Sequence, residues 1–142
     1  MKRVLIVYWS GTGNTQAMAE SVAKGVSDGG GEAILKNAAG ASAALVKDAD
    51  SLAFGCPAMG AEILEESEME PFIASLGSAE VGGKPLGLFG SYDWGDGQWM
   101  RDWVDRMKGL GAQLLGEGLI TQLEPTEEAL VKCYELGKSL AA

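Results

Sequence analysis

Histidine is absent from this 142-residue chain, and cysteine occurs only twice. Without an imidazole, Ser-His and Cys-His nucleophiles cannot form, and a zinc site loses its commonest nitrogen ligand. Cys56 and Cys133 belong to no CxxC pair, so we interpret them as reduced, partly buried thiols. The sequence therefore predicts no metal site.

Long apolar runs are also missing. No stretch approaches the roughly 20 apolar residues that a membrane span requires. The apolar run after Lys2-Arg3 ends at Val7, before a glycine-containing loop, and is too short for the core of a signal peptide. We expect a soluble, cytoplasmic protein that does not enter a membrane.

Basic residues are few, with 11 Lys and Arg against 20 Asp and Glu, for a formal charge of −9. Residues 49–100 contain nine acids and one base and so carry −8, whereas the remaining residues have eleven acids and ten bases and carry −1. This excess argues against nucleic acid or anionic lipid as a partner and favours a basic protein. An acidic face that only aids solubility remains the alternative.

The apolar residues form short runs separated by segments with helical spacing. The runs lack polar alternation, which is typical of strands buried on both faces of a parallel sheet. They lie at residues 4–8, 33–35, 52–55, 86–89 and, more weakly, 114–120. This alternation predicts an α/β fold with a doubly wound sheet, in a single domain of residues 1–142.

Four helices are predicted from apolar stripes and stop signals, whereas residues 37–46 predict no clear element. The stripes are Met18, Val22 and Val26 before Gly29; Phe72, Ile73 and Leu76 before Gly77; Trp99, Trp103, Met107 and Leu110 before Gly111; and Leu130, Tyr134 and Leu140 after Pro125-Thr126. Ligands of such folds bind at the carboxyl ends of the strands. The segments that follow the strands are therefore the candidate site.

The segment after the first strand, Ser10 to Thr15, consists of small polar residues and glycine. It lacks the Gly-Lys-Ser/Thr ending of a P-loop, and Gln16 stands where a dinucleotide fingerprint has its third glycine. Hydroxyls, backbone N–H groups and a helix N-terminus can nevertheless hold a phosphate. The alternative is a plain turn capped by Ser10 or Asn14.

Two further segments offer apolar walls. Met59 lies in the segment 56–62 after one strand, and Trp94 lies among turn-forming residues in the segment 90–97 after the next. An indole in such a turn is more typical of a surface loop than of a core. Together with the phosphate loop, these walls suit a planar ring that carries a phosphate tail.

Three motifs resemble the flavodoxins, specifically the short-chain members from anaerobic bacteria. They are YWSGTGNT (8–15), CPAMG (56–60) with LEESEMEPF (64–72), and LFGSYDWGDGQWMRDW (88–103), in the family's order and spacing. The resemblance implies a three-layer sandwich around a five-stranded parallel sheet of order 2-1-3-4-5. It also implies a monomer with noncovalent FMN that shuttles single electrons at low potential between redox enzymes, by cycling between semiquinone and hydroquinone, with no substrate or catalytic residue of its own.

The resemblance also assigns roles within the site. Phosphate is expected at the first motif, Met59 and Trp94 flank the ring, the Gly60-Ala61 peptide turns over to bond flavin N5-H, and Glu62 bonds N3-H. A Cβ on Ala61 is expected to strain one form of that turn. The full predicted FMN site is Ser10, Gly11, Thr12, Gly13, Asn14, Thr15, Pro57, Ala58, Met59, Gly60, Ala61, Glu62, Ser91, Tyr92, Asp93, Trp94 and Gly95.

The chain departs from the family pattern at two positions. Asp93 stands where members of this branch have glycine, so we expect it to tolerate a left-handed backbone and to depress the hydroquinone potential further. Pro57 stands where some members supply a serine to the phosphate, so that contact is expected to be missing. The acidic residues 62–70 are expected to lie beside the flavin edge and steer a basic redox partner.

Two other functions were weighed. A small FMN-dependent NAD(P)H or quinone reductase shares the fold, but so short a chain shows no segment for a nicotinamide or substrate pocket. A receiver-type signalling domain needs an acid cluster at the first strand end, where the chain has Tyr8-Trp9-Ser10.

Overall fold

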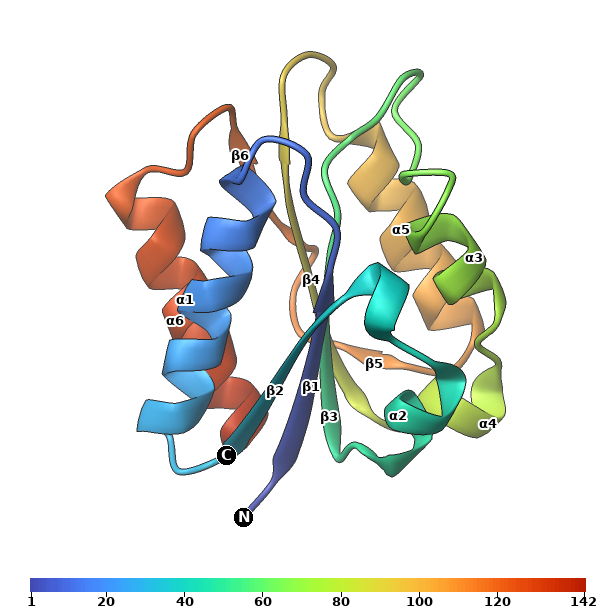
Figure 1. Ribbon diagram of the computed structural model, residues 1–142, viewed down its shortest axis with the longest axis vertical. Helices are drawn as coiled ribbons and strands as arrows, with labels where there is room; N and C mark the ends of the chain where they lie inside the picture. The colour runs from blue at the N-terminus through green and yellow to red at the C-terminus, as the bar shows by residue number, and fades with distance from the viewer.

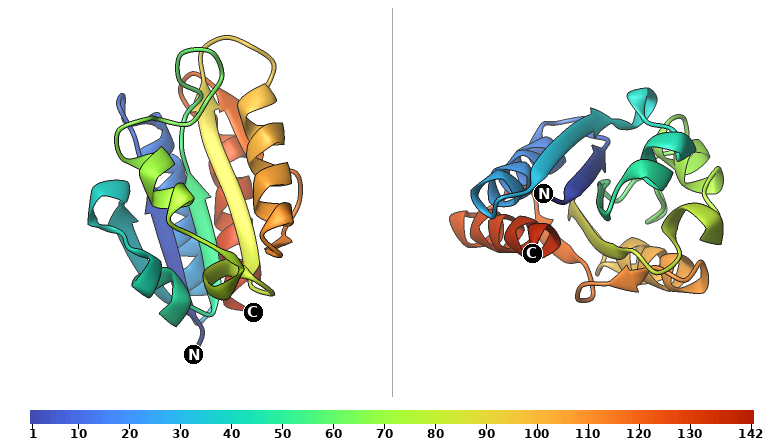
Figure 2. Two further views of the ribbon diagram at one scale, coloured as in Figure 1. Left: turned by 90° about the vertical axis from the view of Figure 1, so that its right-hand side faces the viewer. Right: turned by 90° about the horizontal axis from the view of Figure 1, so that it is seen from below.

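A parallel sheet lies between two layers of helices in the computed structural model, which describes residues 1–142 (Figures 1 and 2). The elements are β1 (Arg3–Tyr8), α1 (Asn14–Asp28), β2 (Glu32–Asn37), η1 (Ala38–Gly40), α2 (Ala43–Asp48), β3 (Ser51–Gly55), α3 (Met69–Ala74), α4 (Ser78–Val81), β4 (Pro85–Tyr92), α5 (Gln98–Gly109), β5 (Gln113–Leu114), β6 (Leu119–Gln122) and α6 (Glu127–Ala141). The predicted fold class is confirmed.

The strands follow the order β2-β1-β3-β4-β5, as the resemblance implied. The fifth position, however, is shared by two strands that both pair in parallel with β4: β5 with its start and β6 with its end. The break falls at residues 115–118, where Gly116 and Gly118 have φ of 83° and 92°. The same two glycines interrupt the apolar run in the sequence and the strand pairing in the structure.

The four predicted helices form, although α3 and α5 end before the last residue of their predicted stripes, and α2 and α4 were not predicted. Helix α1 ends before Gly29, and α6 begins after Thr126, whose hydroxyl accepts a hydrogen bond from the Ala129 N–H at 3.1 Å. Helix α3 ends at Ala74, so Leu76 packs in the core beyond the helix. Residues 37–46, where no element was predicted, contain η1 and the start of α2.

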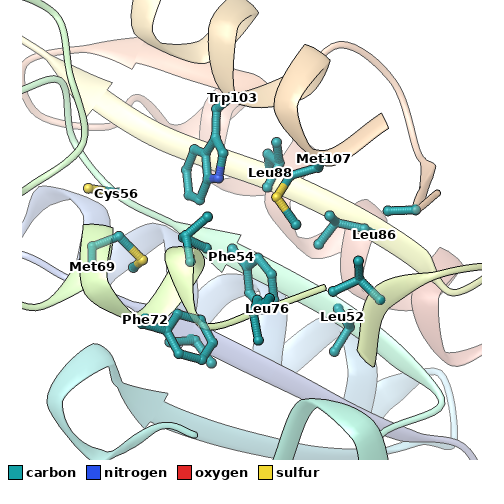
Figure 3. Close-up of a cluster of buried hydrophobic side chains, with 14 of the residues drawn as sticks. Leu52, Phe54, Cys56, Met69, Phe72, Leu76, Leu86, Leu88, Trp103 and Met107 are labelled. Atoms are coloured by element: carbon teal, nitrogen blue, oxygen red, sulfur yellow. The ribbon is translucent and has the colours of Figure 1, made fainter. Parts of the chain in front are cut away.

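Two apolar cores lie on opposite faces of the sheet. The larger, shown in Figure 3, packs α2, α3, α4 and α5 on one face, with Phe54 and Phe72 edge to face at 5.4 Å between ring centroids. The smaller packs α1 and α6 on the other face. These two helices approach so closely that a Cβ on Gly25 would lie 1.9 Å from the carbonyl oxygen of Tyr134.

Because β1, β3 and β4 are parallel, their carboxyl ends meet at one edge of the sheet, at the top of Figure 1. Three connections leave this edge: the first loop (residues 9–13), the second loop (residues 56–68) and the third loop (residues 93–97). The candidate site is therefore assembled from segments that are far apart in the sequence.

Candidate functional site

The first loop ends in a helix N-terminus without a side-chain cap. Gly13 occupies the N-cap position with φ of 97°, and the Ser10 hydroxyl accepts a hydrogen bond from its N–H at 3.1 Å. Neither Ser10 nor Asn14 caps α1, as a plain turn would require. The N–H groups of the first turn have no partner within the helix, so the loop can accept an anion.

Thr15 is the buried residue of the first motif. Its side chain is buried, with 1% exposure, and its Oγ1 lies 3.1 Å from Ser91 Oγ. It also accepts a hydrogen bond from the Ser91 N–H at 3.4 Å. The Thr15 hydroxyl thus joins α1 to β4.

The second loop contains a small hairpin. Met59 and Ile63 exchange two backbone hydrogen bonds of 2.9 and 3.0 Å around the tip residues 60–62. Gly60 has φ of 48°, in the left-handed region that favours glycine. In this form of the turn Ala61 does not have positive φ, and the second left-handed residue of the tip is Glu62, with φ of 57°.

The Glu62 side chain crosses to the third loop. Its Oε1 accepts hydrogen bonds from the N–H groups of Gly97 at 3.2 Å and Gln98 at 3.0 Å, at the N-terminus of α5. A negative charge there is stabilised by the helix dipole. A Cβ on Gly95 would lie 2.5 Å from the Glu62 carboxyl carbon, so glycine permits this approach.

The third loop presents an exposed indole beside an exposed acid. Trp94 is 62% exposed, as expected for a surface loop. The backbone carbonyl of Asp93 accepts a hydrogen bond from Gln122 Nε2 at 3.1 Å. Asp93 does not use the left-handed backbone that it was expected to tolerate, because only Glu62 and Leu123 among the non-glycine residues have positive φ. The loop therefore places no conformational demand for glycine at position 93.

Two neighbouring cavities unite the three loops, and they share Ala58, Met59 and Asp93. One, of about 150 Å³, is also lined by Trp9, Gly11, Thr12, Pro57, Ser91 and Tyr92. The other, of about 220 Å³, is also lined by Gly60, Glu62 and Trp94. An elongated ligand with an anionic end and a flat apolar end fits this arrangement, because donors lie at one end and Met59 and Trp94 at the other.

Most of the predicted site residues line these cavities, but six do not. The exceptions are Ser10, Gly13, Asn14, Thr15, Ala61 and Gly95. Trp9 lines the first cavity and was not predicted. Its signal in the sequence was an aromatic residue directly between a strand and a polar loop.

The acids of residues 62–70 are largely engaged in local structure. The Glu65 carboxylate is only 6% exposed and accepts hydrogen bonds from the N–H groups of Ser67, Glu68 and Met69 and from the Ser67 hydroxyl. Burial opposes its ionisation, but these bonds outweigh burial and hold the pKa of Glu65 below its ordinary value.

Glu70 is the one acid of this segment that is paired with a cation. It forms two hydrogen bonds of 2.7 Å with Arg106, and this pairing lowers the pKa of Glu70. Glu62 and Glu68 accept from neutral N–H groups, and Glu66 has no partner. The segment therefore keeps most of its negative charge while its side chains hold the loop.

Both cysteines are unpaired thiols in the interior. Both are buried, and burial raises the pKa of Cys56 and of Cys133 to about 12. Cys56 lies at the start of the second loop, where its Sγ accepts from the Glu65 N–H at 3.4 Å. No group of three or more acids and cysteines lies close enough to hold a metal ion.

Volume alone does not single out the site. Cavities of about 380 and 400 Å³ lie beside α6, lined mainly by residues of α6, β6 and the segment before β6, none of which belongs to the three motifs. Their linings bring no polar loop or helix N-terminus together with an aromatic wall. In addition, no helix combines the length and apolar character needed to cross a bilayer.

Comparison with known proteins gives one consistent result. The family model described as Flavodoxin matches residues 6–137. The flavodoxin of Clostridium beijerinckii is 49% identical over 136 residues, which cover 96% of this chain and 97% of the relative. The Megasphaera elsdenii flavodoxin is 40% identical over 97% of this chain and 98% of the relative. The solved structure of its two-electron reduced form superposes with a TM-score of 0.85, at 40% identity over 97% of this chain and 98% of that one.

Proposed function

The chain belongs to the flavodoxin family, and we propose that its FMN occupies the two neighbouring cavities at the ends of β1, β3 and β4. It is a small FMN-binding electron carrier rather than an enzyme. When bound, FMN supplies a group that accepts and releases electrons one at a time. The observation that carries the proposal is that one polar loop, one hairpin and one indole loop line two cavities that share three residues.

The phosphate end would be held by the first loop and the start of α1. Thr12 and Asn14 offer side-chain donors, and the first turn of α1 offers N–H groups with no helical partner. No lysine or arginine occurs in residues 8–15. The loop therefore holds a dianion without neutralising it, and the remaining negative charge lowers the potential at which the protein accepts an electron.

The ring end would lie between Met59 and Trp94. Glu62 uses Oε1 on α5, which leaves Oε2 available to accept a hydrogen bond from a ring N–H. The carbonyl of Gly60, at the hairpin tip, would accept a second one. A Cβ on Gly60 would meet nothing within 4 Å, so glycine serves the backbone conformation there rather than space.

A basic partner would dock over the second loop. Glu62, Glu65, Glu66 and Glu68 lie there without a neutralising cation, and a field of one sign steers an oppositely charged protein. We propose a monomer that acts in the cytoplasm, where two buried, unpaired cysteines stay reduced. Electron-transfer rates with a basic partner should fall as ionic strength rises, and insensitivity to salt would contradict steering.

Stepwise anaerobic reduction of the purified protein, followed by its visible spectrum, tests the proposal. We expect a yellow protein with one FMN per chain, in which uptake of the first and second electrons gives separate spectral changes. Failure to take up FMN would overturn the site. Direct bleaching in one two-electron step by NAD(P)H alone would instead indicate a reductase.

A further inference from the structure

An indole–carboxylate hydrogen bond links the first and second loops. Trp9 Nε1 donates to Glu68 Oε1 at 2.9 Å, and both side chains are partly buried. The two residues are 59 positions apart in the sequence. A hydrogen bond to an ionised acceptor is about twice as strong as one between neutral groups, so this is a substantial connection.

The Trp9 ring lies at the phosphate end of the site. A Cβ on Gly11 would lie 3.1 Å from the Trp9 Cη2 atom, so the indole lies directly against the first loop. The ring also lines the cavity that Gly11 and Thr12 share with Pro57, and it packs against the larger core. The first loop is therefore supported by the indole, and the position of the indole depends on its N–H bond.

The acceptor is itself held rigidly. The Glu65 carboxylate fixes the backbone N–H groups of Glu68 and Met69 at 2.8 and 2.9 Å, and the Met69 side chain is fully buried. The backbone at Glu68 is thus held in place by Glu65, independently of the hydrogen bond to Trp9. Less conformational entropy is then lost when the bond forms.

We infer that Glu68 is a positioning residue, which holds the Trp9 indole against the first loop and thereby shapes the phosphate end of the FMN site. This inference rests on the proposed function. Without the acceptor, the indole is free to turn and the first loop loses its support. Binding of a flavin that carries a phosphate then weakens, whereas binding of riboflavin, which lacks it, changes little.

Three variants test the acceptor, its negative charge and the donor of this hydrogen bond separately. Glu68→Leu removes both, Glu68→Gln keeps an acceptor oxygen, and Trp9→Phe removes the donor while keeping a ring. Glu66→Leu is the matched control, because Glu66 lies on the same loop, is exposed and has no partner.

The first measurement needs no flavin. Hydrogen exchange of the Trp9 indole N–H in the apoprotein, followed by NMR, should be at least tenfold faster in Glu68→Leu than in the parent, and unchanged in Glu66→Leu. The indole N–H of Trp99, which donates to the Cys56 carbonyl at 3.1 Å, is the internal reference. Equal exchange of Trp9 in Glu68→Leu and Glu66→Leu would overturn the inference.

The second measurement compares dissociation constants for FMN and riboflavin by quenching of flavin fluorescence. Glu68→Leu and Trp9→Phe should each weaken FMN about tenfold and riboflavin less than twofold, with Glu68→Gln in between. The double variant should be no worse than either single one, because both remove one bond. Equal losses for the two flavins would overturn the assignment to the phosphate end, and a parent protein that binds neither flavin would overturn the proposed function while leaving the exchange result valid.

Discussion

The first and second loops of the site are built by opposite means. The second loop is tied by side chains at several points: Glu62 to α5, Glu65 to its own backbone and Glu68 to Trp9. The first loop has a single internal side-chain bond, from the Gly13 N–H to Ser10 Oγ. The carboxylates of the second loop therefore face N–H groups, whereas the first turn of α1, which follows the first loop, has no side-chain cap.

This difference follows from what each loop is proposed to hold. A flat ring needs walls at a fixed separation, so the second loop is ordered in advance by carboxylates that face N–H groups. A phosphate brings its own acceptors, so the first loop must keep donors available. The acidic residues thus have a structural use in addition to any effect on partners.

The largest effect is expected from removing the buried carboxylate of the second loop. Glu65→Ala should lower the free energy of unfolding of the apoprotein by about 3 kcal/mol, because it leaves buried N–H groups without an acceptor. Urea denaturation measures this change. Glu66→Ala, which removes an exposed acid without a partner, should stay within about 0.5 kcal/mol. A similar loss in both variants would refute the comparison.

Lowering the pH should destabilise the protein by protonating the same Glu65 carboxylate. The pKa of Glu65 lies below its ordinary value of 4.5, so its contribution to stability is complete above that value and is lost as pH falls through the lower, folded-state pKa. Urea denaturation of the apoprotein at a series of pH values should show stability falling steeply below about pH 5. Glu65→Gln should make stability less dependent on pH in that range. A variant whose stability falls as steeply as that of the parent would show that Glu65 is not responsible.

A somewhat smaller effect is expected where the second loop meets the third. Gly95→Ala should cost about 2 kcal/mol, because a Cβ at φ of 90° is strained and also displaces the Glu62 carboxyl from α5. Gly60→Ala, whose Cβ meets nothing, should cost about 1 kcal/mol. Thermal unfolding of the two apoproteins gives the order, and a reversed order would show that Glu62 does not hold the loops together.

In the first loop, by contrast, a substitution should weaken FMN binding more than it lowers the stability of the apoprotein. Ser10→Ala removes the exposed acceptor of the Gly13 N–H and should change apoprotein stability by less than about 0.5 kcal/mol. It should also weaken FMN binding about fivefold, because it removes one hydroxyl from the proposed phosphate site and a single hydrogen bond contributes about 1 kcal/mol. Denaturation and flavin titration on the same sample separate the two effects. A large loss of stability would mean that the first loop is ordered in the same way as the second.

The smallest effect is electrostatic. Asp93→Asn removes one exposed negative charge from the wall shared by both cavities and should raise the potential for uptake of the second electron. Asp105→Asn, on the exposed side of α5, is the control with the same change of charge. Redox titration of both variants decides the matter, and an unchanged second potential in Asp93→Asn would dismiss the idea.

Sequence by itself determined the strands, the main helices and the three segments that line the candidate site. These are local properties: apolar runs, stripes at helical spacing and glycine stops act within a few residues of one another. The polar run 10–15 and the surface position of Trp94 were predictable for that reason, whereas the role expected of Gly60 followed only from the family resemblance. The break in the fifth strand was not, because it depends on how two short apolar runs pair with β4.

Tertiary structure alone decided which partner each polar side chain finds. Thr15 reaches Ser91 across 76 residues, Glu62 reaches Gln98 across 36, and Trp9 reaches Glu68 across 59. The sequence presents residues 62–70 only as an acidic segment, and it contains no signal for which carboxylates turn inward. Their direction is fixed when the parallel strands bring three loops to one edge, because each buried N–H group must then find an acceptor within reach.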